Sequence, residues 1–269
     1  MHSPLEIAKN YIIVCVNKAK IPVLKMYILG IMAGIFIAFA GVTSSVANAL
    51  VNRFIGACVF PAGMAMVLLA GSELFTGNNL IILAVLDRQI KARQMLKNWL
   101  FVYLGNFTGA LLIAALTVFS GTFDAFPETV ITIARNKAVM NFGDAFIRGI
   151  LCNILVCIAV WMSFASKKAE GKIMTIFFPI IAFVFCGFEH SIANMYYLPA
   201  GLFALMRYGI EGDGLTCLNA LINNLLPVTL GNIVGGTGVG FGYWFIYLHA
   251  TKNISRKEEE EELGYAEEY

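Results

Sequence analysis

CGFEHSIANM, residues 186–195, places a glutamate, a histidine and an asparagine inside an apolar stretch. Ile173 to Phe185, which precede it, include one polar side chain, and Tyr196 to Met206, which follow it, are mostly apolar. A similar stretch, AGSELFTGNN at residues 70–79, interrupts another apolar run. Both contain the pattern Gly-x-Glu-x4-Asn. This repeated pattern predicts two helices that are broken at corresponding places.

The composition is that of a membrane protein. Of the 269 residues 59% are hydrophobic and 13% charged, whereas about a quarter of the residues in a soluble domain are charged. The net charge of +2 is divided among short loops and predicts no nucleic-acid partner. A helix needs about 20 apolar residues to cross a bilayer. Six segments are long enough to cross: 27–47, 55–86, 98–119, 144–165, 173–206 and 218–248. The second, fifth and sixth of these are longer than one crossing requires.

Further matches indicate a duplication. LGNFTG begins at Leu104 and LGNIVG at Leu230, and Gly-Ile begins the first and fourth segments at Gly30 and Gly149. The matches occur in the same order in residues 27–119 and 144–248. Since each half has three segments, the second half enters the membrane from the opposite side. The sequence therefore predicts an all-α membrane protein with six transmembrane helices in two inverted three-helix repeats, the second and fifth helices being broken.

The basic residues predict the orientation, because cytoplasmic loops are rich in lysine and arginine. Most lie in the leader, the loops after the second and fourth segments, and the tail; those on the other side are Arg53, Arg135, Lys137, Arg148 and Arg207. We expect a multi-pass protein of the inner (plasma) membrane with both termini cytoplasmic. Residues 1–26 form an amphipathic helix at the cytoplasmic surface, beginning with a Ser3–Glu6 capping box; residues 27–249 form the channel domain, and 250–269 an acidic cytoplasmic tail.

His190 is the most informative single residue. An ionisable side chain in a membrane span indicates function more often than packing. An imidazole there can protonate a weak-acid anion or stabilise it when protonated. Thr76 in the first interruption faces His190 if the repeats pack about their axis, and Leu74 and Phe75 beside it form an apolar gate or merely pack.

The other polar residues have alternative explanations. Glu73 and Glu189 are equivalent, and we expect each carboxylate to accept hydrogen bonds from backbone amides at its break rather than to relay protons. Asn153 and Asn232 join helices, cap a broken helix or line a pore. Arg148 reaches lipid headgroups or concentrates anions at an entrance. The six cysteines follow no paired spacing and are interpreted as reduced packing residues without a metal.

At SELFTG (72–77), ILCNILVC (150–157), GFEHSIANM (187–195) and PVTLGN (227–232) the sequence resembles the formate/nitrite transporter family. The resemblance implies an aquaporin-like protomer in a homopentamer, each protomer having its own pore. It implies a gating loop at residues 74–76, a central histidine at His190 with proton transfer involving Thr76 and Glu189, and paired asparagines at Asn153 and Asn232.

The resemblance also implies an outer apolar constriction at Phe60, Met64 and Phe183, and an inner one at Leu74 and Phe75. Formate, nitrite and hydrosulfide are the anions implied, without a bound cofactor. The residues around His190 favour formate, whereas Arg148 and Met64 are more similar to the nitrite and hydrosulfide branches.

Two functions outside anion transport are disfavoured. A rhomboid-like intramembrane protease also has six spans and a membrane histidine, but it requires a Gly-x-Ser-Gly nucleophile motif, which the sequence lacks. A pore for neutral solutes does not explain His190. We therefore predict a channel and not an enzyme.

Overall fold

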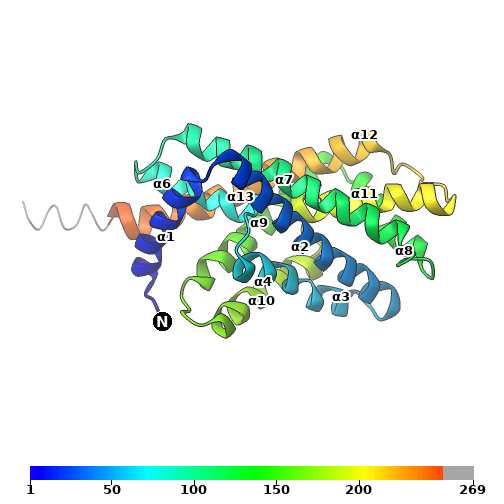
Figure 1. Cartoon of the computed structure of the whole chain (residues 1–269), viewed down its shortest axis with the longest axis horizontal. Coiled ribbons are helices and arrows are strands. Elements are labelled where there is room, and N and C mark those ends of the chain that lie inside the picture. The colour runs from blue at the N-terminus through cyan, green and yellow to red at the C-terminus, as the bar shows by residue number, and fades with distance from the viewer. Residues whose placement is uncertain (251–269) are drawn as a thin grey trace, which may run out of the picture.

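The computed structural model describes residues 1–250, and the described chain is helical (Figure 1). The helices are α1 (Pro4–Lys20), α2 (Val23–Leu50), α3 (Arg53–Val59), α4 (Pro61–Ala70), α5 (Phe75–Asn78), η1 (Asn79–Ile81), α6 (Ile82–Leu86), α7 (Ala92–Phe119), α8 (Pro127–Ala138), α9 (Phe142–Ser163), α10 (Ala169–Cys186), α11 (Ser191–Tyr208), α12 (Cys217–Asn219), η2 (Ala220–Leu225), α13 (Leu226–Trp244) and η3 (Phe245–His249). Within residues 1–250, six helices are long and apolar enough to cross a membrane.

The predicted spans are found, and the second and fifth are interrupted where the sequence predicts. The second predicted span is divided between α4 and α5, and the fifth between α10 and α11. Gly71 ends α4 with φ +77°, and Gly187 ends α10 with φ +73°. Glycine adopts this left-handed conformation without the steric cost that a Cβ imposes. The sixth predicted span, in contrast, is helical throughout from α12 to η3.

Each half is built on one closely packed helix pair, α2 with α7 and α9 with α13. Glycines allow the approach. A Cβ at Gly109 of α7 would collide with the carbonyl of Ile31, and one at Gly235 of α13 with that of Ile150. The repeated Leu-Gly-Asn and Gly-Ile patterns thus mark the two crossings, where small residues let backbones touch.

This packing predicts a position-specific effect of adding one methyl group. Gly109→Ala is expected to destabilise the protein by about 1–3 kcal/mol, the usual cost of overpacking a filled interface. Gly238→Ala is the matched control, since among the described residues no atom beyond its chain neighbours and the nearby backbone of α13 lies within 4 Å of a Cβ at that position. Thermal unfolding in detergent would compare the two. Equal melting temperatures would contradict the role assigned to Gly109.

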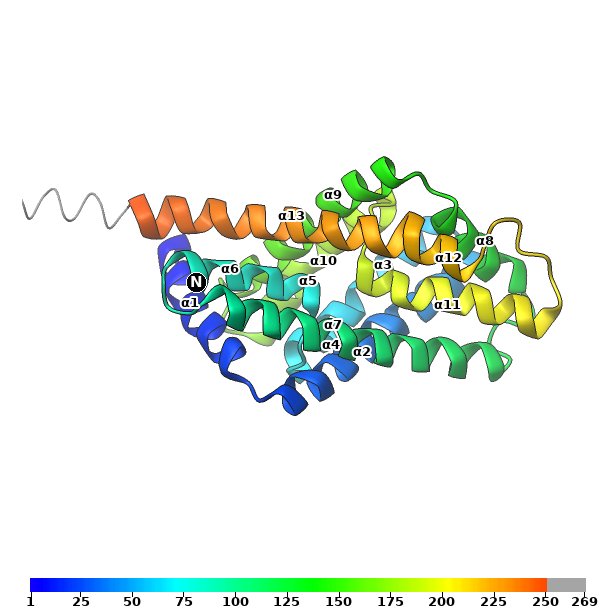
Figure 2. The same ribbon diagram turned by 90° about the horizontal axis from the view of Figure 1, so that it is seen from above.

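The ends of the bundle carry short helices (Figures 1 and 2). α1, α6 and the last turns of α13 lie at one end, while α8 and α12 lie at the other. The first and last described residues are therefore at the same end. α8 was not predicted from the sequence. The predicted acidic tail lies outside the described residues except for Ala250.

α1 begins with the predicted capping box, which the structure confirms. Ser3 Oγ accepts from the Glu6 amide, and the Ser3 amide donates to the Glu6 carboxylate, which lowers the pKa of that carboxyl. Its apolar face packs on the protein, with Ala8 and Cys15 fully buried and the Tyr11 ring against Phe164. This face is therefore covered by the channel helices themselves.

One packing prediction is wrong in part. All six cysteines, which lie within the described residues, are free thiols, but Cys186 and Cys217 are exposed. They lie at the last position of α10 and the first position of α12, where the chain leaves the helix interface. Apolar composition alone does not distinguish such positions from a buried one.

Candidate functional site

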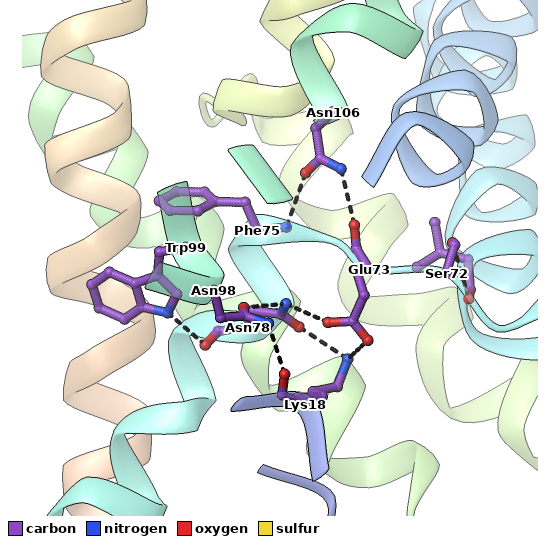
Figure 3. A network of polar contacts seen from close by, with 9 residues as sticks. Lys18, Ser72, Glu73, Phe75, Asn78, Asn98, Trp99 and Asn106 are labelled. Atoms are coloured by element: carbon purple, nitrogen blue, oxygen red, sulfur yellow. Dashed lines mark hydrogen bonds and ion pairs between the residues drawn. The ribbon is translucent and has the colours of Figure 1, made fainter. Parts of the chain in front are cut away.

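The first break leaves backbone groups without helical partners, and Asn106 of α7 binds two of them, the Phe75 amide and the Glu73 carbonyl (Figure 3). Its Oδ1 accepts from the Phe75 amide at 3.0 Å, and its Nδ2 donates to the carbonyls of Gly30 at 2.8 Å and Glu73 at 2.9 Å. Asn106 is fully buried. A broken helix at membrane depth is tolerated where protein groups satisfy its backbone, as here.

The Glu73 carboxylate lies in a separate polar network with Lys18 of α1 (Figure 3). Lys18 Nζ is 2.6 Å from Glu73 Oε1 and 3.0 Å from Asn78 Oδ1. Asn78 Nδ2 donates to Glu73 Oε2 at 2.6 Å and to Asn98 Oδ1 at 2.8 Å. Asn98 Nδ2 in turn donates to the Lys18 carbonyl at 3.2 Å, which closes the network. The buried carboxylate thus has both a counter-charge and hydrogen bonds.

The second break is held in the same way by Asn232 of α13. Its Oδ1 accepts from the Ser191 amide at 2.9 Å. Its Nδ2 donates to the carbonyls of Gly149 at 2.8 Å and Glu189 at 3.0 Å. Among the alternatives for Asn232, the structure shows a cap on a broken helix.

The Glu189 carboxylate repeats the network of Glu73, with Lys137 of α8 in the place of Lys18. Lys137 Nζ lies 2.9 Å from Glu189 Oε1 and 3.0 Å from Oε2. Asn194 Nδ2 donates to Glu189 Oε2 at 2.7 Å and to Asn224 Oδ1 at 2.6 Å. Asn224 Nδ2 donates to the Lys137 carbonyl at 3.2 Å. Four contacts recur in both networks: lysine to glutamate, asparagine to glutamate, asparagine to asparagine, and asparagine to the lysine carbonyl. The networks differ in that Lys18 also binds Asn78, whereas Asn224 also donates to Glu189 at 3.1 Å. α1 and α8 lie at opposite ends of the bundle.

The prediction that backbone amides hold the two glutamates is therefore wrong. Within the described residues, side chains of lysine and asparagine bind both carboxylates. The physical reason is charge: a buried carboxylate is stable only with a counter-ion and hydrogen bonds. The backbone amide freed at each break is uncharged and needs no charged partner. It donates to the side-chain oxygen of one asparagine, Asn106 at the first break and Asn232 at the second.

Sequence reasoning missed the partners of both glutamates, although the spacing contained a signal. Lys18 and Lys137 are separated by the same interval as Gly30 and Gly149, and Asn98 and Asn224 by the same interval as the two Leu-Gly-Asn motifs. Comparing all polar residues at these intervals would have found them. We instead used both lysines only to predict orientation, Lys18 as part of the amphipathic leader and Lys137 on the other side of the membrane.

His190 is buried, only 2% exposed, and is the N-cap of α11. Its Nδ1 accepts from the Ala193 amide at 3.1 Å. Because that amide is an obligatory donor, the neutral ring carries its proton on Nε2. Nε2 lies 2.8 Å from Oγ1 of Thr76 and donates to it. The structure thus brings the two interruptions together through one side-chain contact.

Asn153 connects the first break to the second half. Its Nδ2 lies 3.2 Å from the Thr76 carbonyl, 2.7 Å from Asn79 Oδ1 and 2.6 Å from the Asn232 carbonyl. The side chain is fully buried. Asn153 therefore acts between helices, and it fixes the backbone of the threonine that contacts His190.

A small apolar chamber of about 10 Å³ lies beside His190. It is lined by Ile37, Phe60, Met64, Leu74, Val156, Ile180, Phe183 and His190. This volume suits a single small molecule the size of water. Four of the five predicted constriction residues line it; the fifth, Phe75, does not. The Phe75 ring instead packs edge-on against Tyr103, with centroids 4.9 Å apart, and against Trp99.

A much larger cavity of about 610 Å³ lies on the other side of His190, at the end of the bundle that carries α8. Its lining is mixed and includes the charged residues Arg53, Lys137, Arg148 and Glu189. His190 lines both spaces. Phe60 and Phe183 line both spaces as well, so a charged solute in the large cavity meets the imidazole together with these two rings at the boundary with the apolar chamber.

Comparison with known proteins identifies the family. The sequence profile described as formate/nitrite transporter matches residues 5–245. The chain belongs to the formate/nitrite transporter family. A probable formate transporter of Methanothermobacter thermautotrophicus is 39% identical, over 91% of this chain and 97% of that protein. The formate channel FocA of Escherichia coli K12 is 37% identical, over 87% of this chain and 90% of that protein.

Solved structures of the family have the same fold. A pentameric formate channel with formate bound has a TM-score of 0.75 and is 33% identical; the match covers 84% of this chain and 98% of that channel's chain. An ion channel of the family has a TM-score of 0.81 and is 28% identical; the match covers 89% of this chain and 98% of that channel's chain. The chain is therefore a multi-pass membrane protein with the fold of the family's channels.

Proposed function

We propose that the chain is a channel or proton-coupled facilitator for formate, with one pore in each protomer of a homopentamer. The observation that carries this proposal is the position of His190, which contacts Thr76 and lines both a large cavity with charged side chains and an apolar chamber. An anion that enters such a chamber must lose its hydration or its charge. The formate channels among the relatives and the pentameric structural neighbour support the substrate and the assembly.

In this proposal the cationic lining of the large cavity raises the local concentration of anions. The anion then accepts hydrogen bonds from His190 Nε2–H and the Thr76 hydroxyl, which at present bind each other. For proton transfer, His190 takes a proton on Nδ1, which requires the Ala193 amide to release it. The Nε2 proton then moves to the carboxylate, and neutral formic acid crosses the apolar part beside Leu74.

The remaining polar residues position this pair. Glu189 and Asn232 hold the backbone around His190, and Glu73 and Asn153 hold that around Thr76. Arg148 in the large cavity serves the anion entrance. We assign Phe60, Met64 and Phe183 to the outer constriction, and Leu74 with Phe75 to the inner one.

The topology in this proposal places α1 and both termini in the cytoplasm of an inner-membrane protein. The leader, the loops before α7 and α10, and the tail carry most of the lysines and arginines. The first and last described residues lie at the same end (Figure 1). The large cavity then opens to the outside, and the two halves are inverted repeats.

Nitrite and hydrosulfide are the alternative substrates of the same transport function. Arg148 and Met64 are more similar to the nitrite and hydrosulfide branches, and all three ions are small monovalent anions of weak acids. Formate is preferred because the formate channels among the relatives match most of the chain.

The proposal is tested by flux into liposomes that contain the purified full chain. Formate, nitrite and hydrosulfide uptake would be measured between pH 5 and 8 against protein-free liposomes. We expect saturable formate flux that rises towards acid pH, because more of the anion then crosses with a proton. A faster rate for nitrite or hydrosulfide would transfer the assignment to that anion. Flux of water or glycerol without any of the three anions would refute it.

A further inference from the structure

The large cavity contains two guanidinium groups that the proposed proton transfer does not use. Its cationic lining residues are Arg53, Lys137 and Arg148. The Lys137 ammonium is bound to Glu189. In contrast, neither guanidinium forms an ion pair or hydrogen bond within residues 1–250, and both side chains are exposed in the cavity. Two positive charges therefore remain available to a ligand.

Both arginines lie next to the backbone that leads to His190. Arg53, at the start of α3, reaches the C-cap of α10, where a Cβ on Gly187 would lie 2.7 Å from its Nη2. The backbone carbonyl of Arg148 in α9 accepts a hydrogen bond from the Glu189 amide at 3.2 Å. The end of a helix carries a partial negative charge, which favours a cation such as Arg53 there. The two guanidinium groups thus border one entrance from two helices.

The chemistry of this entrance suits an oxyanion that carries two charges. Guanidinium groups bind carboxylate, sulfate and phosphate oxygens through parallel hydrogen bonds. Hydroxyl and amide groups of Ser44, Asn48, Thr132 and Asn136 supply further neutral donors to the same cavity. A volume of about 610 Å³ accommodates such an ion together with its water.

A divalent ion cannot continue beyond this cavity. The chamber past His190 has about 10 Å³ and an apolar lining. The desolvation cost of an ion rises with the square of its charge and reaches several kcal/mol even for one charge. Sulfate has no weakly acidic proton site in the neutral pH range by which it could lose that charge. It therefore stops where formate continues.

We propose that Arg53 and Arg148 form a binding site for small divalent oxyanions, whose occupancy blocks the entry of formate. This inference rests on the proposed transport function. Nothing in the proton transfer requires Arg53, so the site adds a means by which external sulfate, thiosulfate or a similar dianion regulates uptake. Binding is weak, because exposed charges contribute little individually.

Sulfate is the probe for the test. Formate influx into liposomes containing the full chain would be measured with increasing external sulfate, the ionic strength being held constant with gluconate. We expect sulfate to raise the apparent KM for formate without changing the maximal rate, and radioactive sulfate not to accumulate. Arg53→Gln and Arg148→Gln should each weaken this inhibition about three- to fivefold.

Arg135→Gln is the matched control. It removes the same charge at the same end of the molecule, but Arg135 pairs with the exposed Asp213 and does not line the cavity. Equal effects of all three variants would reduce the result to general surface charge and overturn the site. Accumulation of sulfate would overturn the block.

Calorimetric titration of sulfate into the detergent-solubilised protein separates the two proposals. Arg53-dependent binding without any formate flux would refute the proposed function and leave the site intact. Formate flux without sulfate binding or inhibition would refute the site and leave the function intact. Binding that Arg53→Gln does not change would also overturn the assignment of the site.

Discussion

Replacing His190 with asparagine is expected to reduce formate flux at acid pH at least about tenfold, since a positioned proton-transfer group contributes roughly 10²–10⁴-fold. Asparagine is a preferred N-cap, so its Oδ1 can replace Nδ1 as the acceptor for the Ala193 amide. Its amide can still contact Thr76. The variant therefore removes proton exchange while it conserves the end of α11.

The pH profile distinguishes this role from a structural one. The wild-type rate should rise towards acid pH, whereas the rate of the His190→Asn variant should be nearly constant. His2→Asn, at a partly exposed position just before α1, is the control for loss of an imidazole elsewhere. Melting temperatures would establish that both variants are folded. A wild-type pH dependence in His190→Asn would exclude His190 as the proton carrier.

Replacing Lys137 with methionine should cause the largest loss of stability, about 3–5 kcal/mol. Glu189 is 3% exposed, and the substitution leaves its carboxylate with asparagine amides but no counter-charge. Removing one partner of a buried ion pair is more costly than removing both. Size-exclusion chromatography after heating would measure the unfolding midpoint.

A second substitution isolates the charge as the cause. Glu189→Gln in the Lys137→Met background should recover most of the lost stability, because no uncompensated charge then remains. Lys9→Met, on the exposed face of α1, is the control for the same change without an ion pair. The Glu189 carboxylate does not require the lysine if Lys137→Met has the same melting temperature as the wild type, or if Glu189→Gln does not restore the stability of that variant.

The membrane spans and both breaks could be predicted because their cause is local. A span needs about 20 apolar residues whatever its neighbours, so Glu73 and His190 are conspicuous within such runs. The α8 helix was missed for the same reason: it has 12 residues, with Glu128, Arg135 and Lys137 among them, and no search for apolar length detects it. Its helical pattern becomes meaningful only once α1 is recognised as its counterpart.

The partners within the site depend on contacts between distant residues. Thr76 was expected to face His190 because the repeat implies that relation, and the two lie 2.8 Å apart. No local pattern indicates that Lys18 reaches Glu73, or that Asn153 binds the Thr76 carbonyl. The position of Phe75 against Tyr103 is likewise a result of packing, which composition does not specify.

The network around Glu73 also has a consequence for biosynthesis. All of its members, from Lys18 to Asn98, are translated before Lys137. Chains fold from the N-terminus as they are synthesised, domain by domain. The nascent first half can therefore neutralise its buried carboxylate during membrane insertion, without waiting for the second. A protein shortened by the first twenty residues would have to insert Glu73 without its lysine, so we expect membrane insertion to depend on α1.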